Sequence, residues 1–377
     1  MMRSVKYFCW LFAAALCVAI CAGSPAWSQS EVTLTDIAGR KVTVKLPVRH
    51  VVLGEGRQLT ALALLHPDPV SLVAGWLGDL KRLDSKTYEL FRSKNPAIDK
   101  IPLIGITNES TFSVERTLSI RPDVAIFSGG HGPSARSAEA VRQLEAAGIP
   151  VVFIDFHDKP LENSVASIAI LGKLLGQEEK ASAYIKFYQD RLDLIAKRIA
   201  EAKPKRPTVF MHMHARLWEC CPSPGKGNLG EYIVFAGGSN IAADILPGAT
   251  GQVNLEYVIQ RNPDIYIATG GAHAINRGLA IGTYVTEDDA RKALQTIAEE
   301  KGINTLSAVA NGRVYGLWHH FYNSPLNIIA IEAFAKWFHP ELFADVDPRK
   351  TLAEINARFL AVPFDGVYFV SLKPEKR

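Results

Sequence analysis

The longest continuous helical pattern in the chain covers residues 178–202. Apolar side chains recur there at steps of three and four, which places them along one face of a helix. These residues are Ala181, Tyr184, Ile185, Tyr188, Leu192, Ile195, Ile199 and Ala202. Glu178 and Glu179 would lie at the positive end of the helix dipole, while Pro204 and Pro207 stop the pattern. The pattern predicts a helix roughly 37 Å long, about the width of a small domain.

Two segments on either side of this helix repeat each other. Residues 113–130, SVERTLSIRPDVAIFSGG, align without a gap with residues 254–271, NLEYVIQRNPDIYIATGG. In each copy a short helix leads through a Pro-Asp turn into a buried strand that ends at two glycines. The aligned pairs include Glu115 with Glu256, Pro122 with Pro263, and Asp123 with Asp264. The repeat predicts two similar lobes with the long helix between them.

Apolar runs typical of strands alternate with helical stretches in both halves. The runs HVVLG, SLVAGW, DVAIFSGG and VVFIDF precede the long helix, and TVFMHMH restarts the pattern after it. This alternation favours parallel sheets. We therefore expect an α/β fold with two Rossmann-like lobes, each with a central parallel sheet, joined by one long α-helix. The expected boundaries are 29–160 for the N-terminal lobe, 161–204 for the connecting helices, and 205–377 for the C-terminal lobe.

Residues 1–28 have the pattern of a secretory signal peptide. Arg3 and Lys6 precede an apolar run, and a small-residue cleavage pattern follows it. The run is shorter than the ~20 residues that a membrane-spanning helix needs. Neither Cys17 nor Cys21 follows the small residue that lipoprotein processing requires. We expect a cleaved signal peptide and a soluble periplasmic protein without a lipid anchor.

Charge and cysteine usage exclude several classes of protein. The formal net charge is +4, and two of these charges belong to the signal peptide, so nothing indicates a nucleic-acid partner. Only Cys220 and Cys221 remain after cleavage, and adjacent cysteines exclude a disulfide framework. The pair could form a vicinal disulfide in an oxidising compartment or remain as two thiols. The sequence also lacks P-loop, dinucleotide-binding, G-x-S-x-G and H-E-x-x-H motifs.

Aromatic, imidazole and guanidinium side chains gather where the predicted strands end. Ligands of open parallel sheets bind outside the carboxyl ends of the strands. Side chains of these types suit a flat, anionic or metal-chelated ligand. The predicted ligand-binding residues are Arg57, Trp76 and His131 in the first lobe, and His214, Arg216, Trp218, His273, Trp318, His319, His320 and Tyr322 in the second.

His212 and His214 share one side of the predicted strand TVFMHMH because side chains alternate along a strand. Their backbones would lie about 7 Å apart, which allows both imidazoles to reach one metal ion. This is a weaker alternative to a chelate that fills the coordination sphere of its own metal. Imidazole ligands must be neutral, so with an unperturbed pKa of about 6.5 binding would weaken as pH falls from about 7.5 to about 5.5.

Six segments of the chain carry a family resemblance. They are TDIAGRKVTVKLPVRHVVLG, SVERTLSIRPDVAIFSGG, GIPVVFID, LGKLLGQEEKA, PGATGQVNLEYVIQRNPDIYIATGG and SAVANGRVYGL. In this order they resemble the periplasmic substrate-binding proteins of ABC importers for iron–siderophore complexes, haem and cobalamin. The resemblance covers nearly the whole mature chain and implies two α/β lobes on one long helix, little hinge motion and no catalysis. The segments HMHARLWECCPSPGKG and WHHFYNSP depart from the general family pattern and leave the ligand open.

The resemblance implies a solute-binding protein that captures a metal chelate, first of all a ferric siderophore, between its lobes. It would deliver this ligand to an ABC transporter permease dimer with its ATPase, acting as a monomer without a cofactor. Haem, cobalamin, a metal–amino-acid complex or a free transition metal are the alternatives, and a secreted hydrolase is a remote one. Glu115 and Glu256 match the glutamates, one in each lobe, with which this family engages arginines of the transporter.

Overall fold

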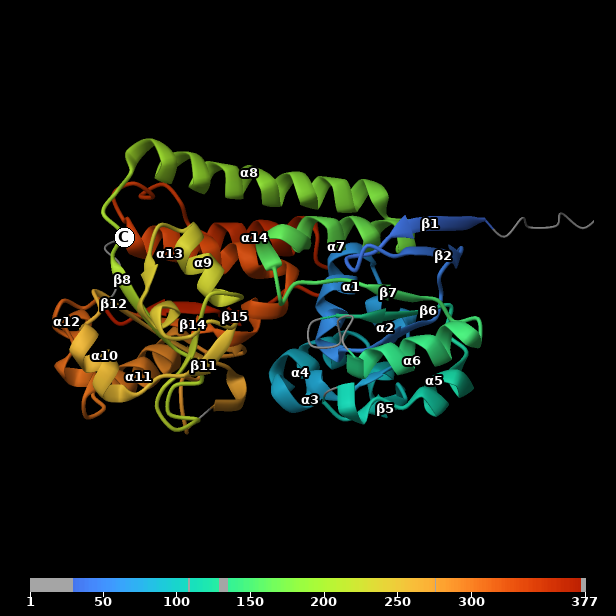
Figure 1. Ribbon diagram of the computed structural model, residues 1–377, viewed down its shortest axis with the longest axis horizontal. Helices are drawn as coiled ribbons and strands as arrows, with labels where there is room; N and C mark the ends of the chain where they lie inside the picture. The colour runs from blue at the N-terminus through green and yellow to red at the C-terminus, as the bar shows by residue number, and fades with distance from the viewer. Residues whose placement is uncertain (1–29, 108, 129–134, 275, 374–377) are drawn as a thin grey trace, which may run out of the picture.

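The computed structural model describes residues 30–107, 109–128, 135–274 and 276–373. Two α/β lobes lie side by side, and the helix α8 (Glu178–Ala202) runs along both of them at the top of Figure 1. The predicted fold class and the predicted bounds of the long helix are confirmed. The predicted signal peptide lies outside the described residues. Within the described residues, no helix is long and apolar enough to cross a membrane.

The N-terminal lobe is built on a five-stranded parallel sheet of order β5-β4-β3-β6-β7. Its strands are β3 (Val51–Leu53), β4 (Val73–Leu77), β5 (Leu103–Gly105), β6 (Val124–Phe127) and β7 (Val151–Phe153). Its helices are α1 (Leu59–Leu65), α2 (Pro69–Leu72), α3 (Asp79–Leu83), α4 (Ser85–Lys94), α5 (Val114–Ile120) and α6 (Ala135–Ala146). A hairpin of β1 (Glu31–Thr35) and β2 (Lys41–Lys45) precedes them. The chain reverses its direction of progress across the sheet between β3 and β6, which forms a crevice at their carboxyl ends.

The C-terminal lobe has a second five-stranded sheet of order β10-β8-β12-β14-β16, in which only β16 is antiparallel. Its strands are β8 (Thr208–His212), β10 (Ser239–Asn240), β12 (Ile265–Gly270), β14 (Val314–Trp318) and β16 (Phe369–Ser371). Its helices are α9 (Leu229–Phe235), α10 (Leu255–Arg261), α11 (Glu287–Ala298), α12 (Ser307–Ala310), α13 (Ile328–Phe338) and α14 (Pro348–Arg358). Two small ribbons pair β9 (Pro222–Pro224) with β11 (Thr250–Gln252), and β13 (Gly282–Thr283) with β15 (Gly366–Val367). Here the order reverses between β8 and β12, which forms the second crevice.

The sequence repeat corresponds to a repeated structural unit. Asp123 precedes β6, and its Oδ2 accepts hydrogen bonds from the backbone N–H groups of Arg49 and His50, just before the neighbouring β3. Asp264 precedes β12, and its Oδ2 accepts from the backbone N–H of Thr208 at the start of the neighbouring β8. Each Pro-Asp turn therefore aligns the central pair of strands of its lobe, which explains why the two copies agree.

The buried stripe of α8 connects the helix to both lobes. Its buried residues are Ala181, Tyr184, Phe187, Tyr188 and Ile195. The helix packs against α7 (Pro160–Leu175) and α13, and the Tyr184 hydroxyl donates a hydrogen bond of 2.7 Å to the carbonyl of Pro325. The predicted stripe missed Phe187, whose ring packs against Phe359. It wrongly included Ala202, which is exposed because the helix extends past the core at this end.

The contact between α7 and α8 is tight at Gly172. A Cβ atom added there would lie 2.5 Å from the Cβ of Ala181. An alanine ordinarily stabilises a helix interior by roughly 0.5–1 kcal/mol over glycine, but here it would force the two helices apart. We expect Gly172→Ala to lower the free energy of unfolding by about 1 to 3 kcal/mol in denaturant titrations. Adding Ala181→Gly should recover part of the loss, whereas a more stable Gly172→Ala protein would contradict the tight contact.

A buried hydrogen-bond network joins the two lobes opposite α8. Glu55 follows β3 and is 3% exposed, and both of its carboxylate oxygens lie 2.8 Å from Nδ2 of Asn323 in the other lobe. Ser128 Oγ donates to the same carboxylate at 2.8 Å, and Gln58 Nε2 donates to Oδ1 of Asn323 at 3.0 Å. Asn323 ends the short helix η8 (His319–Asn323). We call these contacts the interlobe network, and they fix η8 over the crevice of the N-terminal lobe.

Asn323→Asp tests the interlobe network with an almost isosteric change. It would replace the donating amide with a second carboxylate beside buried Glu55, so that like charges meet in a region of low polarity. We expect a loss of unfolding free energy of about 1 to 3 kcal/mol or more, measured in denaturant at neutral pH. The control Asn311→Asp lies on the exposed end of α12 and should change stability little. Equal stability of the two variants would contradict the network.

Candidate functional site

Four imidazoles meet between the lobes, each placed by the carboxyl end of a strand. His214 follows β8, His273 follows β12, and His319 and His320 follow β14. Ring centroids lie 3.8 Å apart for His214 and His319, 5.8 Å for His214 and His273, and 6.2 Å for His273 and His320. We call these four residues the histidine cluster. They come from three loops around the crevice of the C-terminal lobe, which is where an α/β sheet presents its ligand.

The backbone after β8 turns sharply to deliver His214. Its φ is 48° and that of Arg216 is 65°, both in the left-handed region that side chains with a Cβ rarely adopt. The turn is held by two bonds to Thr269 on β12, whose Oγ1 accepts from the N–H of His214 at 3.1 Å and whose carbonyl accepts from Ala215. Such backbone conformations gather at functional sites because the surrounding bonds must enforce them.

Three imidazole nitrogens of the cluster have no hydrogen-bond partner among the described residues. Within the described part of the chain, Nδ1 of His214, His273 and His320 is buried without a hydrogen-bond partner. The other contacts orient the rings, since His319 Nδ1 lies 2.9 Å from Oγ1 of Thr269 and His320 Nε2 lies 3.2 Å from the carbonyl of Leu83 in the other lobe. A neutral imidazole nitrogen with a free lone pair is a common transition-metal ligand.

The cluster is neutral at physiological pH. Burial lowers the pKa of all four imidazoles, and that of His214 falls to about 4. The neighbouring histidines add to this effect at His214 and His319, and the charge of Arg57 adds to it at His319 and His320. The unperturbed pKa of about 6.5 assumed from the sequence therefore does not hold for these groups. Neutral imidazoles can bind a metal without first losing a proton.

Arg57 forms the wall of the site on the side of the N-terminal lobe. Its guanidinium forms ion pairs with Glu55 and with Asp79, the latter at 3.0 Å, and donates a hydrogen bond to the Tyr322 hydroxyl. Burial acts to lower the pKa of Arg57, but Glu55 and the other oxygen groups outweigh it, so the side chain stays charged. The Tyr322 ring lies 4.8 Å from that of His319. Two carboxylates balance the charge of Arg57. The predicted contact of Arg57 with a ligand stays a prediction.

The three predicted tryptophans occupy different places. Trp218 is 54% exposed and its ring lies 4.1 Å from that of His214, at the rim of the cluster. Trp76 is 3% exposed and packs on Tyr88 in the N-terminal lobe. Trp318 is 2% exposed and lies behind His320, 5.4 Å from its ring. Of the three, only Trp218 has the exposure of a stacking surface, and the predicted contacts of Trp76 and Trp318 with a ligand stay predictions.

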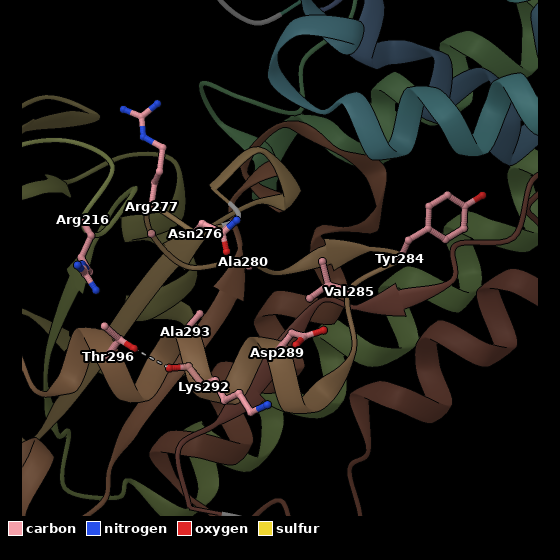
Figure 2. A pocket seen from close by; sticks show the side chains of 11 residues that line it. Arg216, Asn276, Arg277, Ala280, Tyr284, Val285, Asp289, Lys292, Ala293 and Thr296 are labelled. Carbon is pink, nitrogen blue, oxygen red and sulfur yellow. Dashed lines mark hydrogen bonds between the residues drawn. The ribbon is translucent and has the colours of Figure 1, made fainter.

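Arg216 is directed to another part of the C-terminal lobe. Its Nε lies 3.1 Å from a carboxylate oxygen of Glu300. It also lines a hollow of about 380 Å³, which Figure 2 shows above α11. Other residues lining this hollow include Asn276, Arg277, Tyr284 and Lys292. Arg57 and Arg216 are therefore paired with different carboxylates, and the predicted contact of Arg216 with a ligand stays a prediction.

His212 is the last residue of β8, and its surroundings differ from those of His214, which follows the strand. Its ring lies in the core with Nδ1 2.7 Å from the Tyr266 hydroxyl, beside Cys220 and Cys221. These cysteines form a disulfide, which decides between the two states left open by the sequence. The structure does not support a metal held by both His212 and His214. The strand β8 ends between these residues and the chain turns.

Three predicted residues, His131, Glu115 and Glu256, lie outside the histidine cluster or outside the described residues. His131 lies outside the described residues. Glu115 and Glu256 are exposed in the first turns of α5 and α10, which lie on the side of the two lobes away from α8 (Figure 1). Thr269 and Leu83 both orient histidines of the cluster, but the sequence did not identify them. A threonine inside a buried strand and a backbone carbonyl carry no signal in the sequence.

One family pattern and three known proteins are similar to this chain. The pattern of the periplasmic binding protein family matches residues 62–319. The crystal structure of the TroA-like periplasmic binding protein FepB from Veillonella parvula is 30% identical with a TM-score of 0.83, over 91% of this chain and all of that one. Helicobacter pylori CeuE, solved as a Ni-His complex, shares the fold at 18% identity and a TM-score of 0.62, covering 89% of this chain and 97% of CeuE.

A cobalamin-binding protein of Halobacterium salinarum is 25% identical over 217 residues, or 57% of this chain. The match spans 52%, about half, of the length of that relative. The family pattern and the FepB similarity agree with the resemblance carried by the six segments and with the two lobes on one helix. The chain therefore belongs to the periplasmic binding protein family, whose members are extracytoplasmic solute-binding proteins that serve ABC importers and are not enzymes.

Proposed function

We propose that this protein captures a transition-metal complex with an incomplete coordination sphere and that the histidine cluster completes it. The observation that carries this proposal is that three neighbouring imidazoles, which burial keeps neutral, have buried Nδ1 atoms without a hydrogen-bond partner in the part of the chain that the structure describes. Among the described residues, no three ligand atoms of the cluster lie within 4.8 Å of one another, so the cluster would supply one or two ligands and the chelate the others. A buried polar atom without a partner costs about 1 to 3 kcal/mol, which a metal bond would offset. A ferric siderophore supplies all the ligands of its metal, so these nitrogens favour a metal–amino-acid complex over the siderophore expected from the sequence.

The chemistry of the donors narrows the class of metal. Imidazole nitrogen suits nickel, copper, zinc and ferrous iron, whereas ferric siderophores present iron bound by hard oxygen ligands. The Ni-His complex of H. pylori CeuE supports the same class, although that similarity extends to the fold alone. The exposed ring of Trp218 would cover the complex at its rim. After capture, the protein would deliver the complex to an ABC permease dimer with its ATPase.

Removing cluster nitrogens should weaken the binding of Ni²⁺ with L-histidine. We expect His214→Ala, and the double variant His319→Ala/His320→Ala, each to raise the Kd at least roughly tenfold in calorimetric titrations. The matched control His50→Ala removes an imidazole that is 63% exposed on the N-terminal lobe and should leave the Kd unchanged. If both cluster variants bind the nickel complex like the parent, or if only a ferric hydroxamate binds to the parent, the proposal fails.

The pH dependence of binding should follow the lowered pKa values. A protonated imidazole cannot bind a metal, and the pKa of His214 lies at about 4, so this group stays neutral until the pH approaches that value. We expect its contribution to the affinity to be constant between pH ~7 and ~5 and to fall as pH approaches ~4. Titrations of the parent and of His214→Ala, with a nickel complex whose own protonation is known, measure the difference. A loss centred near pH ~6.5 would show that the imidazole keeps its ordinary pKa.

Glu115 and Glu256 should act in delivery and not in capture. Both are exposed on equivalent first turns, one in each lobe, so together they would address the two halves of a permease dimer. We expect Glu115→Ala/Glu256→Ala to abolish uptake by cells while leaving the Kd in solution unchanged. The control Glu139→Ala/Glu299→Ala removes exposed glutamates elsewhere in the same lobes. Normal uptake by the first double variant, or a weaker Kd, would contradict a docking role.

A further inference from the structure

A second group of metal-binding side chains lies beside the end of β8, outside the histidine cluster. One nitrogen of His212 and the Sγ atoms of Cys220 and Cys221 all lie within 4.8 Å of one another. The two sulfurs are joined as a disulfide. We propose that reduction of this disulfide creates a three-coordinate site for a soft monovalent metal ion, Cu(I), with His212, Cys220 and Cys221 as its ligands.

His212 is prepared to act as one of these ligands. The residue is 1% exposed, and within the described part of the chain its Nε2 is buried without a hydrogen-bond partner. Its Nδ1 lies 2.7 Å from the hydroxyl of Tyr266, a fully buried residue on the adjacent strand β12. When Nδ1–H donates to that hydroxyl, the lone pair of Nε2 is free, which is the arrangement in which metal-binding histidines are held.

The backbone holds the cysteines in place independently of the disulfide. Cys221 and Val253 exchange two backbone hydrogen bonds of 2.9 Å, and the N–H of Met213 donates to the carbonyl of Pro222 at 2.7 Å. These bonds fold the loop back onto β8, so the sulfurs would stay near His212 after the disulfide opens. Cys221 is fully buried, while Cys220 is partly exposed and offers an ion a route from solvent.

The set of donors favours Cu(I) over other ions. Thiolates are soft ligands that select Cu(I), and one imidazole is compatible with it. Among the described residues, the group contains no carboxylate and no fourth histidine or cysteine. Zn²⁺ with two cysteines and one histidine takes a water as its fourth ligand, which a site with buried His212 and Cys221 disfavours. Hard ions such as Mg²⁺ and Ca²⁺ prefer oxygen. A buried site with two sulfurs and one nitrogen therefore fits an ion that accepts three soft donors.

Opening the site requires an external dithiol. A thiolate of that dithiol attacks the disulfide, and its second thiol completes the exchange, so the dithiol becomes a disulfide and the bond between Cys220 and Cys221 breaks. The two cysteine sulfurs gain the two electrons and take up two protons. Binding of Cu(I) then releases these two protons to solvent. The oxidised protein offers only His212, so the redox state controls whether the site exists.

Anaerobic competition with the chromophoric Cu(I) chelator bicinchoninate tests the proposal on the mature chain. The protein is prepared oxidised, or treated with dithiothreitol and desalted. We expect the reduced form to remove from the chelator one more Cu(I) per chain than the oxidised form does. X-ray absorption at the copper edge of the reduced form should show two sulfur neighbours and one nitrogen neighbour. Equal uptake by both forms, or copper without sulfur neighbours, would overturn the proposal.

Variants separate this site from the histidine cluster. Cys220→Ser/Cys221→Ser should lose the additional Cu(I) yet bind Ni²⁺ with L-histidine normally, and His273→Ala should keep the sulfur-bound copper. Tyr266→Phe retains all three ligands but removes the partner of His212 Nδ1, and we expect roughly 10- to 100-fold weaker Cu(I) binding. Unchanged Cu(I) affinity in Tyr266→Phe would contradict the role assigned to His212. X-ray absorption of the parent protein identifies the copper ligands even if a variant fails to fold.

Discussion

The buried carboxylate of Glu55 is the charge on which the arrangement of the site depends. Moving a carboxylate out of water costs several kcal/mol unless it is both paired and hydrogen-bonded. Here the pairing comes from Arg57 of its own lobe, and part of the hydrogen bonding comes from Asn323 of the other lobe. Because Asn323 ends η8, satisfying this one charge also brings His319, His320 and Tyr322 of the same short helix to the crevice.

Two different restraints hold the lobes together. On one side, α8 is a continuous helix that packs on α7 and α13 and donates a side-chain hydrogen bond to Pro325. On the other side, the lobes meet through the interlobe network and through the hydroxyls of Thr87 and Thr283, 2.8 Å apart. A continuous helix bends less readily than an extended linker, so these contacts largely set the relative position of the two lobes.

The electrostatics of the site are consistent with metal capture. Arg57 remains charged because its carboxylate partners outweigh the effect of burial, and its charge helps to keep His319 and His320 neutral. One wall therefore presents a cation matched by buried anions, and the opposite wall presents neutral nitrogen donors. Neutral nitrogen donors are the form of histidine that binds transition metals.

Local patterns in the sequence were sufficient to predict the elements and their order. The periodicity of residues 178–202, the two Pro-Asp repeats and the alternation of strand and helix are local signals, and they predicted α8, the two lobes and the strand ends that deliver His214, His273, His319 and His320. Which of the candidate side chains lie together depends on how the loops meet in three dimensions. Trp76 and Trp318 are buried, Arg216 pairs with Glu300, and His212 faces a disulfide. Side-chain direction, burial and pKa depend on which distant loops meet, and no local pattern contains that information.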